Sequence, residues 1–559
     1  MALVFFQPVS MQAEELAFAI KGYMVEGNSI LTEEEITLVL QPFTGPEKTS
    51  ETVNQARDAL ERFYHHQGYP TVLVNIPLQT LDSDMVKLQV MESKIGKVRV
   101  TGNKYFTMKR LRRSLPAILT GRILYLPQFE RELNRLNRNR HIKVAPVLSP
   151  GKEYGTIDVE LKVKDKLPFH GSVELNNYAG HNTTDLRSSI KLTYDNFWQR
   201  DHSLSLQFQT SPQDMEEVCV FAGSYLMGSW LNPDHLTAIY GVVSDSETSL
   251  VELGSLMNMV SKGNILGLRY IIPLTPRGDY YHSLTLGIDY KDFDDTTDFS
   301  SSQSEASPSE GDAGSGITTA GDDESADEST KDVKAIDYLP LSIDYSGNFS
   351  DPWGQNRFSL GITTALRGIV SHQEEFDEKR PTALQAASGE KVIGKARADF
   401  MIFTSSISRE QKLWDYGAIY GKINIQQANM PLIANEQFYA GGVNSVRGYK
   451  ESEVTGDSGM SGTMEIRLPD GGPVVENRLH SGVSLSLQPY LFYEAATLSV
   501  KQPSAGQKSG FTLQGIGGGI RGHISRFFHY QLDVGCPLVR TDDTGSGDLR
   551  FYFKVSGEF

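Results

Sequence analysis

One stretch of this chain reads Gly441-Gly442-Val443-Asn444-Ser445-Val446-Arg447-Gly448-Tyr449, a glycine-rich segment that carries a single cation. Glycines allow a backbone to fold tightly into a confined space. An arginine in such a place needs an anionic partner, because a partly buried charge without one is costly. The stretch therefore predicts a loop that folds inward and is pinned at Arg447. The runs on either side of it predict strands.

Apolar and polar residues alternate with period two from Pro168 to the end of the chain. A barrel in lipid requires this alternation, because its outer face meets hydrocarbon and its lumen meets water. A soluble β-sandwich, whose polar face meets bulk water, is the alternative. The pattern persists at even spacing over about 400 residues, which favours the membrane barrel. Clear examples are Leu204–Phe208, Leu284–Tyr290, Leu339–Tyr345, Phe358–Ile362 and Val483–Leu487.

The connections between the expected strands alternate between short and long, as periplasmic turns and external loops do in such barrels. Counting them predicts a sixteen-stranded antiparallel transmembrane β-barrel over residues 167–559, with both ends in the periplasm. The glycine-rich stretch then belongs to the sixth external loop, residues 426–460, which we expect to fold inward.

Another predicted external loop, residues 292–337, carries most of the chain's net negative charge. Thirteen Asp and Glu residues and one Lys lie from Asp292 to Asp332, a net charge of −12 out of −16 for the whole chain. The rest of the chain therefore carries only −4, and the acidity says nothing about the barrel itself. The Ser, Gly and Asp composition of this loop predicts disorder.

The front of the chain repeats itself, because Val25-Glu-Gly27-Asn28 matches Val100-Thr-Gly102-Asn103 at a spacing of 75 residues. In each copy a β-rich run ends at a Gly-Asn turn, and a threonine can cap the helix that follows. A second amphipathic helix and two strands complete the copy. We expect two α+β domains, over residues 17–94 and 95–166. Residues 1–16 are expected to be an N-terminal tail or the remnant of a signal peptide.

The two repeats resemble POTRA domains. Together with the sixteen-strand pattern and Val446-Arg447-Gly448-Tyr449 in the sixth loop, they resemble the two-partner secretion transporters of the ShlB/FhaC/HecB type. These transporters belong to the superfamily that also contains the general barrel-assembly proteins of the outer membrane. The resemblance covers roughly residues 17–559. It implies that the loop enters the lumen and that its arginine pairs with a carboxylate in a Phe-x-Asp-x-Gly motif on strand thirteen.

The matching positions on strand thirteen are Phe492, Glu494 and Ala496, so the carboxylate is one methylene longer and the glycine is replaced. Side-chain parity supports the same partner independently. If Leu485 and Leu487 face lipid, Glu494 faces the lumen. We therefore predict a pair between Arg447 and Glu494 that anchors or gates the loop. Two separately solvated charges are the alternative.

Other residues are expected near this pair. On strand twelve, Glu465 and Arg467 share the lumenal face with Ser461 and Thr463. In the loop, the arginine's neighbours in the motif are expected to complete the anchor. These neighbours are Val446, Gly448 and Tyr449.

The second repeat is strongly basic, with eleven Lys and Arg against two acidic residues from Lys104 to Lys143. This excess predicts a patch that binds an acidic partner or lipid phosphates, and a solvated helix face is the alternative. Its arginines are Arg110, Arg112, Arg113, Arg135, Arg138 and Arg140. At the other end of the chain, the terminal Phe559 resembles the signal for outer-membrane assembly.

The resemblance implies an outer-membrane transporter of a Gram-negative bacterium. Its periplasmic POTRA domains would capture one unfolded polypeptide, a β-helical exoprotein, and secrete it through the pore without nucleotide. An outer-membrane assembly factor is the alternative, although such proteins usually carry three or more POTRA domains. The chain is expected to be a monomer that contacts outer-membrane lipid and, during biogenesis, the barrel assembly machinery. We expect no enzyme activity, catalytic residue, cofactor, metal or nucleic acid.

Overall fold

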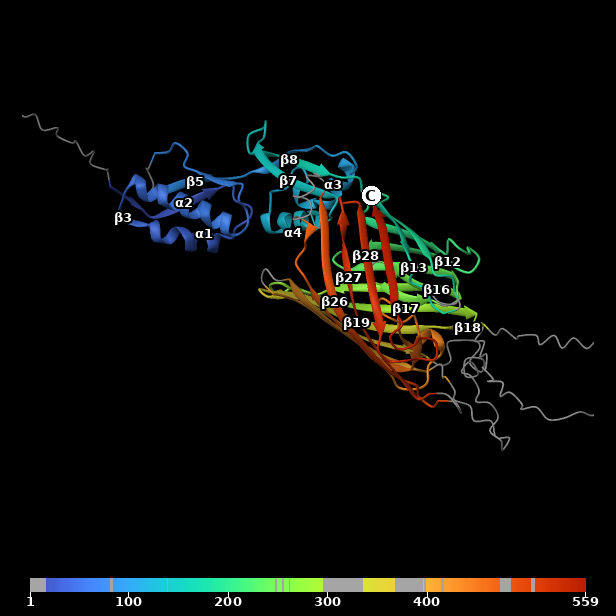
Figure 1. The fold of residues 1–559 in the computed structure, drawn as a ribbon. Coiled ribbons are helices and arrows are strands. Elements are labelled where there is room, and N and C mark those ends of the chain that lie inside the picture. The colour runs from blue at the N-terminus through green and yellow to red at the C-terminus, as the bar shows by residue number, and fades with distance from the viewer. Residues whose placement is uncertain are drawn as a thin grey trace, which may run out of the picture. The chain divides into compact units, whose positions relative to one another are not determined.

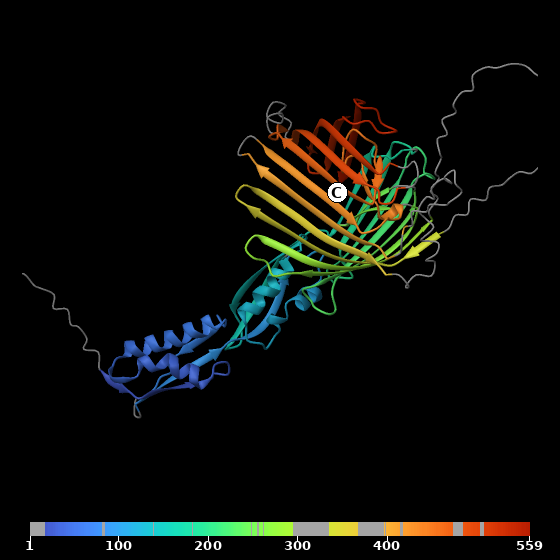
Figure 2. The same cartoon turned by 90° about the horizontal axis from the view of Figure 1, so that it is seen from below.

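The computed structural model describes residues 17–80, 84–137, 139–181, 183–246, 249–253, 256–260, 262–294, 335–366, 396, 399–413, 417–472, 484–503 and 508–559. It divides the chain into two compact units, Met1–Pro168 and Phe169–Phe559 (Figures 1 and 2). The expected N-terminal tail and most of the acidic loop lie outside the described residues. Within the described residues, no helix is long and apolar enough to cross a membrane.

The first repeat of unit one is a three-stranded sheet with two helices packed against it. Strand β2 (Gly22–Glu26) runs parallel to β5 (Met85–Glu92), which pairs antiparallel with β4 (Val72–Asn75). Helix α1 (Glu33–Leu40) begins at a capping box between Thr32 and Glu35. The other elements are η1 (Gln41–Phe43), α2 (Ser50–His66) and the small sheet of β1 (Phe18–Ile20) and β3 (Gly45–Lys48).

The second repeat has the same strand order. Strand β6 (Lys94–Thr101) runs parallel to β8 (Thr156–Asp165), which pairs antiparallel with β7 (Ile142–Pro150). Its helices are α3 (Met108–Ser114), η2 (Pro116–Ile118) and α4 (Leu126–Asn137).

The repeated turn has one geometry in both copies. Gly27 and Gly102 have φ of +86° and +83°, and a Cβ on either would fall 2.4 Å from a carbonyl oxygen of the neighbouring strand. Only glycine fits such a position without strain. Asn28 and Asn103 each donate from Nδ2 to the carbonyl oxygen three residues later, at 2.8 Å. The repeat seen in the sequence is therefore also a repeat of local structure.

Unit two is a closed antiparallel barrel of sixteen strands, which confirms the predicted fold class (Figures 1 and 2). Strands β18 and β19 form the eighth strand, because both pair with β17 in one register. Strand β29 closes the barrel on β9. In chain order the strands are β9 (Phe169–Asn176), β10 (Arg187–Phe197), β11 (His202–Thr210), β12 (Cys219–Gly228), β13 (Leu236–Asp245), β16 (Gly263–Pro273), β17 (Tyr280–Asp294), β18 (Ala335–Tyr338) with β19 (Pro340–Asp351), β20 (Gly354–Ala365), β21 (Met401–Lys412), β22 (Ala418–Ala428), β25 (Ser458–Arg467), β26 (Leu485–Ser499), β27 (Gly510–Ile524), β28 (Phe528–Pro537) and β29 (Arg550–Glu558).

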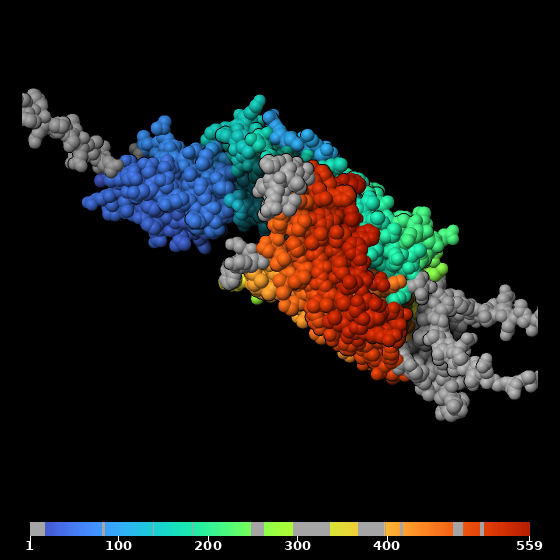
Figure 3. All heavy atoms as spheres, in the orientation of Figure 1, coloured from blue at the N-terminus to red at the C-terminus, as the bar shows by residue number. Residues whose placement is uncertain are grey.

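Side chains alternate across this wall as the sequence pattern predicts. On β26, Leu491 and Tyr493 are exposed on the outer face, whereas Tyr490, Phe492 and Glu494 are buried inside. Figure 3 shows the outer face of β26 to β29, orange to red, as a continuous surface of side chains. A short hairpin of β14 (Ser249–Leu253) and β15 (Leu256–Val260) extends one external connection.

The sixth external connection, residues 429–457, joins β22 to β25, the eleventh and twelfth strands. The flanking strands extend three residues further into the predicted loop at each end than the sequence pattern indicates. The loop contains the turn η4 (Ala434–Glu436) and a hairpin of β23 (Phe438–Ala440) and β24 (Val454–Gly456). We call residues 429–437 its proximal limb and residues 441–453 its tip.

The lumen is not polar throughout, which differs from the simple polar-in pattern. At the external ends of the strands from β12 to β22, inward-facing side chains form one apolar cluster. The proximal limb contributes Leu432 and Ile433, which are 1% and 2% exposed, to this cluster, and other external connections contribute Val218, Ala396 and Phe400. We call the strand residues of this cluster the collar: Val220, Ala222, Tyr240, Val242, Ile265, Phe293, Ile336, Tyr338, Ala365, Ile402 and Ala428.

Candidate functional site

The tip of the sixth loop is built around glycines that no other residue could replace. Gly442 has φ +88°, and a Cβ there would fall 2.1 Å from Cδ of Glu451. Gly448 has φ +108°, and a Cβ there would fall 2.7 Å from the backbone nitrogen of Pro537 on β28. The hydroxyl of Ser445 accepts from the Gly441 N–H at 2.7 Å and closes the turn. The tip therefore has a fixed shape and lies tightly against the wall.

Arg447 lies at the end of this tip, only 2% exposed, and faces three carboxylates. Its Nη2 lies 2.6 Å from Glu494 Oε1 and 3.0 Å from Glu465 Oε1, and its Nη1 lies 3.4 Å from Asp533 Oδ1. Its Nε and its backbone N–H also donate to Glu494, at 3.1 Å and 2.7 Å. The two residues predicted as partners thus lie in contact, and Glu494 makes the most contacts.

Aromatic rings complete the environment of the guanidinium. Its Cζ lies 3.5 Å from the centroid of the Phe492 ring and 5.7 Å from that of Tyr490. Burial lowers the pKa of the Arg447 guanidinium, but Glu494, Asp533 and Glu465 raise it by a larger amount. The pKa therefore lies above its ordinary value. Arg447 is therefore a permanent cation in a dry and strongly anionic place.

The other motif residues attach the tip to the wall. The Gly448 N–H donates to the Tyr552 hydroxyl at 2.7 Å, and that hydroxyl donates to the Tyr449 carbonyl at 2.6 Å. The Tyr449 hydroxyl donates to the Val539 carbonyl at 2.6 Å. Val446 is fully buried in a small apolar cluster with Tyr449 and Ala496. Ala496, which stands where the family motif has glycine, thus contributes apolar contact to the tip.

The expected lumenal residues of β25 extend the charged network. Glu465 Oε2 lies 2.9 Å from Arg467 Nη2 and 3.4 Å from Arg521 Nη2. Arg467 also pairs with Glu410 on β21. Glu465 therefore connects the loop anchor to a second cation on its own strand and to one on β27.

Sequence reasoning missed three parts of this site. Asp533 on β28 binds both Arg447 and the Tyr490 hydroxyl. Tyr552 on β29 bridges two residues of the tip. The glycines Gly515 and Gly535 leave room for the tip, because a Cβ on them would fall 2.1 Å from the Arg447 oxygen and 2.6 Å from the Gly448 nitrogen. The Gly515–Gly519 run was a usable signal, since small residues in a strand mark a close approach of backbone.

A second clamp ties the loop to two other external loops. His181 Nε2 lies 2.6 Å from Glu453 Oε2, and Glu453 also accepts from the Thr541 hydroxyl. The donor atoms of His181, Glu453 and Asp543 lie within 4.8 Å of one another, so these three side chains could hold a metal ion. The pairing of His181 with Glu453 gives the cluster a structural role without one.

Two comparisons of sequence agree with this architecture. The POTRA domain of ShlB type matches residues 18–93, and the family described as haemolysin secretion/activation protein ShlB/FhaC/HecB matches residues 357–522, which include the sixth loop and Glu494. Over these residues the chain matches the two-partner secretion transporters. Members of this family are transporters of the outer membrane, with the barrel in the membrane and the POTRA domains in the periplasm.

A curated relative and two solved structures are similar to this chain over most of its length. The heme/hemopexin transporter protein HuxB of Haemophilus influenzae is 20% identical over 518 residues, 91% of this chain and 82% of the relative. The solved structure of CdiB from Escherichia coli has a TM-score of 0.58 at 18% identity, covering 99% of this chain and 93% of CdiB. BamA from Haemophilus ducreyi, lacking POTRA domains 1–3, has a TM-score of 0.53 at 14% identity, covering 97% and 100%. At these identities the structural likenesses speak for the fold alone.

The predicted basic patch needs one correction. Arg110 is 3% exposed and lies with its guanidinium 4.5 Å from the centroid of the Phe106 ring, so it belongs to the core of the second repeat. Burial lowers its pKa to about 10. Arg112, Arg113, Arg135 and Arg140 are exposed, and Arg138 lies outside the described residues.

The C-terminal Phe559 is placed at the barrel seam. Its backbone N–H and carbonyl exchange hydrogen bonds with Gly171 at 3.0 Å and 3.1 Å, and its ring lies 6.1 Å from Phe169. The last residue thus takes part in closing the barrel.

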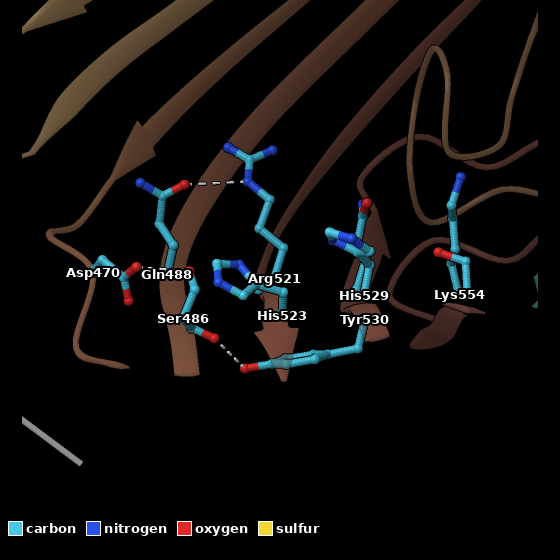
Figure 4. A pocket seen from close by; sticks show the side chains of 11 residues that line it. Asp470, Ser486, Gln488, Arg521, His523, His529, Tyr530 and Lys554 are labelled. Atoms are coloured by element: carbon cyan, nitrogen blue, oxygen red, sulfur yellow. Dashed lines mark hydrogen bonds between the residues drawn. The ribbon is translucent and has the colours of Figure 1, made fainter. Parts of the chain in front are cut away.

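The periplasmic half of the lumen is polar and hollow. A pocket of about 390 Å³ lies among the inner ends of β26 to β29. Figure 4 shows Arg521 and His523 between Gln488 and Asp470 on one side and His529 and Lys554 on the other. Gln488 accepts from Arg521 Nε at 3.3 Å. This pocket, open and charged, contrasts with the dry site around Arg447.

Proposed function

We propose that this chain captures an unfolded partner polypeptide through its POTRA domains and secretes it through the barrel lumen. The observation that carries the proposal is the sixth loop. It lies inside the lumen, yet neither of its strands β23 and β24 joins the barrel sheet, and it is held by contacts at Arg447, at the His181–Glu453 pair and at the collar. A loop held in this way can withdraw and leave a path for a polypeptide while the wall stays intact.

The POTRA domains supply edges for capture. The outer strands are β2 and β4 in the first sheet and β6 and β7 in the second. Some outward backbone groups of β4, β6 and β7 are already bonded, at Val74, Ile95 and Val144, whereas the outer strand β2 has no second strand partner among the described residues. An unfolded chain can add to such an edge through backbone hydrogen bonds with little demand on its sequence. The exposed Arg112, Arg113, Arg135 and Arg140 favour a partner with acidic segments.

The driving force in this proposal is binding inside and folding outside, without nucleotide, cofactor or catalytic step. A β-helical exoprotein suits it, because its repeats can fold one after another as they emerge. The barrel is proposed to act as a monomer in contact with outer-membrane lipid, after insertion by the barrel assembly machinery.

Deleting the gene in its own bacterium tests the proposal. We expect one large protein to disappear from the medium, and a plasmid copy of the wild-type chain to restore it. Quantitative comparison of medium, periplasm and outer membrane by mass spectrometry measures this. Unchanged secretion of every protein would contradict the proposal.

The same experiment separates the alternative function. The likeness to BamA in fold keeps an assembly factor as the second candidate. Loss of an assembly factor lowers the amounts of several barrels in the outer membrane, whereas loss of a secretion transporter leaves them unchanged. A deletion strain with normal secretion and depleted porins would therefore favour the alternative.

A further inference from the structure

The collar is an unusual surface for the lumen of an outer-membrane barrel, where side chains normally meet water. Its members come from strands four to eleven and all point inward, since their outward neighbours, such as Phe221, Val243 and Leu266, are exposed to lipid. Apolar side chains around a wide lumen gain nothing unless something apolar covers them. The collar therefore requires an apolar partner that packs against it.

Part of the cover is an extended apolar segment of the sixth loop, beside Val218, Ala396 and Phe400 of other external connections. Residues 430–433 read Met-Pro-Leu-Ile and lie in neither a helix nor a strand. Ile433 has φ −68° and ψ 156°, an extended conformation. Leu432 and Ile433 are buried in the collar cluster, and Met430 packs against it. The collar thus holds a short peptide mainly by side-chain burial.

Polar groups at both ends of the segment fix its backbone. The Leu432 N–H donates to Oδ1 of the fully buried Asp457 at 2.8 Å. After the segment, Glu436 Oε1 lies 2.5 Å from Lys291 Nζ and accepts from the Tyr338 hydroxyl at 2.5 Å. A carboxylate that accepts from a backbone N–H does not depend on the identity of the side chain it holds. This backbone contact therefore places no demand on the side chain of the segment, and the apolar collar alone selects for apolar side chains.

We propose that the collar is a binding site for extended apolar polypeptide segments. Residues 430–433 occupy it in the closed chain and seal the external end of the lumen. When the proximal limb leaves, the collar receives apolar stretches of the transported chain. The second occupant rests on the proposed function, whereas peptide binding by the collar does not.

Channel recording with the purified full chain in planar bilayers tests this inference. Leu432→Asn with Ile433→Asn removes the apolar cover, and we expect channel opening to rise by about tenfold or more, because each buried aliphatic side chain contributes roughly a factor of ten. A synthetic hexapeptide, Asn-Met-Pro-Leu-Ile-Ala, added on the external side should then close the variant channel. The same peptide with Asn in place of Leu and Ile should leave it open.

A matched control is Leu538→Asn with Leu549→Asn, which changes two exposed leucines of another external loop. Heat-modifiable mobility in gels verifies that each barrel is folded. If the limb variant does not fold, Ile265→Asn places a polar group in the collar cluster from the wall side and should likewise open the channel. Equal closure by both peptides, or opening no greater than in the control, would overturn the inference.

Failure of this inference is distinguishable from failure of the proposed function. A strain that secretes its partner through a chain whose variant channel ignores the peptide would overturn the collar site and leave the transporter standing. A chain whose variant is closed by the peptide but whose deletion changes no secreted protein would support the collar as a peptide site and overturn the transporter.

Discussion

Arg447 is held by more carboxylates than its own charge requires. Glu494 makes the shortest contact, while Glu465 and Asp533 lie farther away. A planar guanidinium with five donors can serve several acceptors at once. Loss of one carboxylate therefore weakens the anchor, whereas loss of the arginine leaves three buried carboxylates without their shared cation, which is far more costly.

The buried carboxyl of Glu451 leads us to expect that docking of the loop depends on pH. It belongs to the tip, outside the membrane-spanning strands, and is buried beneath the Val443 N–H, which donates to it at 2.8 Å. Burial, together with the nearby Glu494, raises its pKa to about 7, although the Val443 N–H and Arg550 act to lower it. The pKa of Glu451 in the docked loop lies above that of a free glutamate. The contribution of Glu451 to the stability of the docked loop is therefore complete below about pH 4 and is lost as the pH rises through about 7.

We therefore expect fewer channel openings in planar bilayers at about pH 5 than at about pH 8. Glu451→Gln keeps an acceptor for Val443 and should make the openings equal at the two values. The ion pair of His181 with Glu453 is unchanged between the wild type and Glu451→Gln, so it does not account for a difference between them. A wild-type channel with the same openings at both pH values would contradict this role for Glu451.

At the scale of elements, strands β27 and β28 form a glycine-lined bed for the loop tip. A Cβ at Gly535 would fall 2.6 Å from the Gly448 nitrogen and 2.8 Å from the Arg447 carbonyl carbon. Backbone cannot yield as a side chain does, so Gly535→Ala should displace the tip and loosen Arg447 without unfolding the barrel. We expect faster protease cleavage within residues 441–453. The control is Gly421→Ala on β22, where nothing lies within 4 Å of the new Cβ, and this variant should be cleaved at the wild-type rate. Equal cleavage rates of the two variants would contradict the role of Gly535 in seating the tip.

Strand alternation explains why part of the site could be predicted from the sequence. Period two fixes which residues share a face, so Glu494, Glu465 and Arg467 were placed inside before their neighbours were known. Asp533 was beyond reach, because its contact with Arg447 depends on how far β28 is staggered against β26 around the barrel. The collar was missed for another reason: Val220 and Val242 look like ordinary strand residues until the loop that covers them is placed.

At the scale of the whole barrel, the sixth loop is attached to two different parts of the wall. Its tip binds strands β25 to β29 through Arg447, Gly448 and Tyr449, and its proximal limb binds strands β12 to β22 through the collar. The loop thus reaches from one part of the wall to another. We expect the release of either attachment to loosen the loop, and the release of both to free it from the lumen.

This arrangement predicts that the two attachments are coupled. Arg447→Gln alone, and Leu432→Asn with Ile433→Asn alone, should each raise the open fraction of single channels, because each releases one end of the loop. Combining them should raise it by more than the product of the separate factors, since the last attachment is then lost. Lys508→Gln, which removes an exposed ion pair with Asp542 at 2.7 Å, is the control and should change nothing. Gel mobility of the folded barrel must stay normal in every variant. A combined effect equal to the product would mean that tip and limb open independently, and that the loop acts as two separate gates instead of one tether across the lumen.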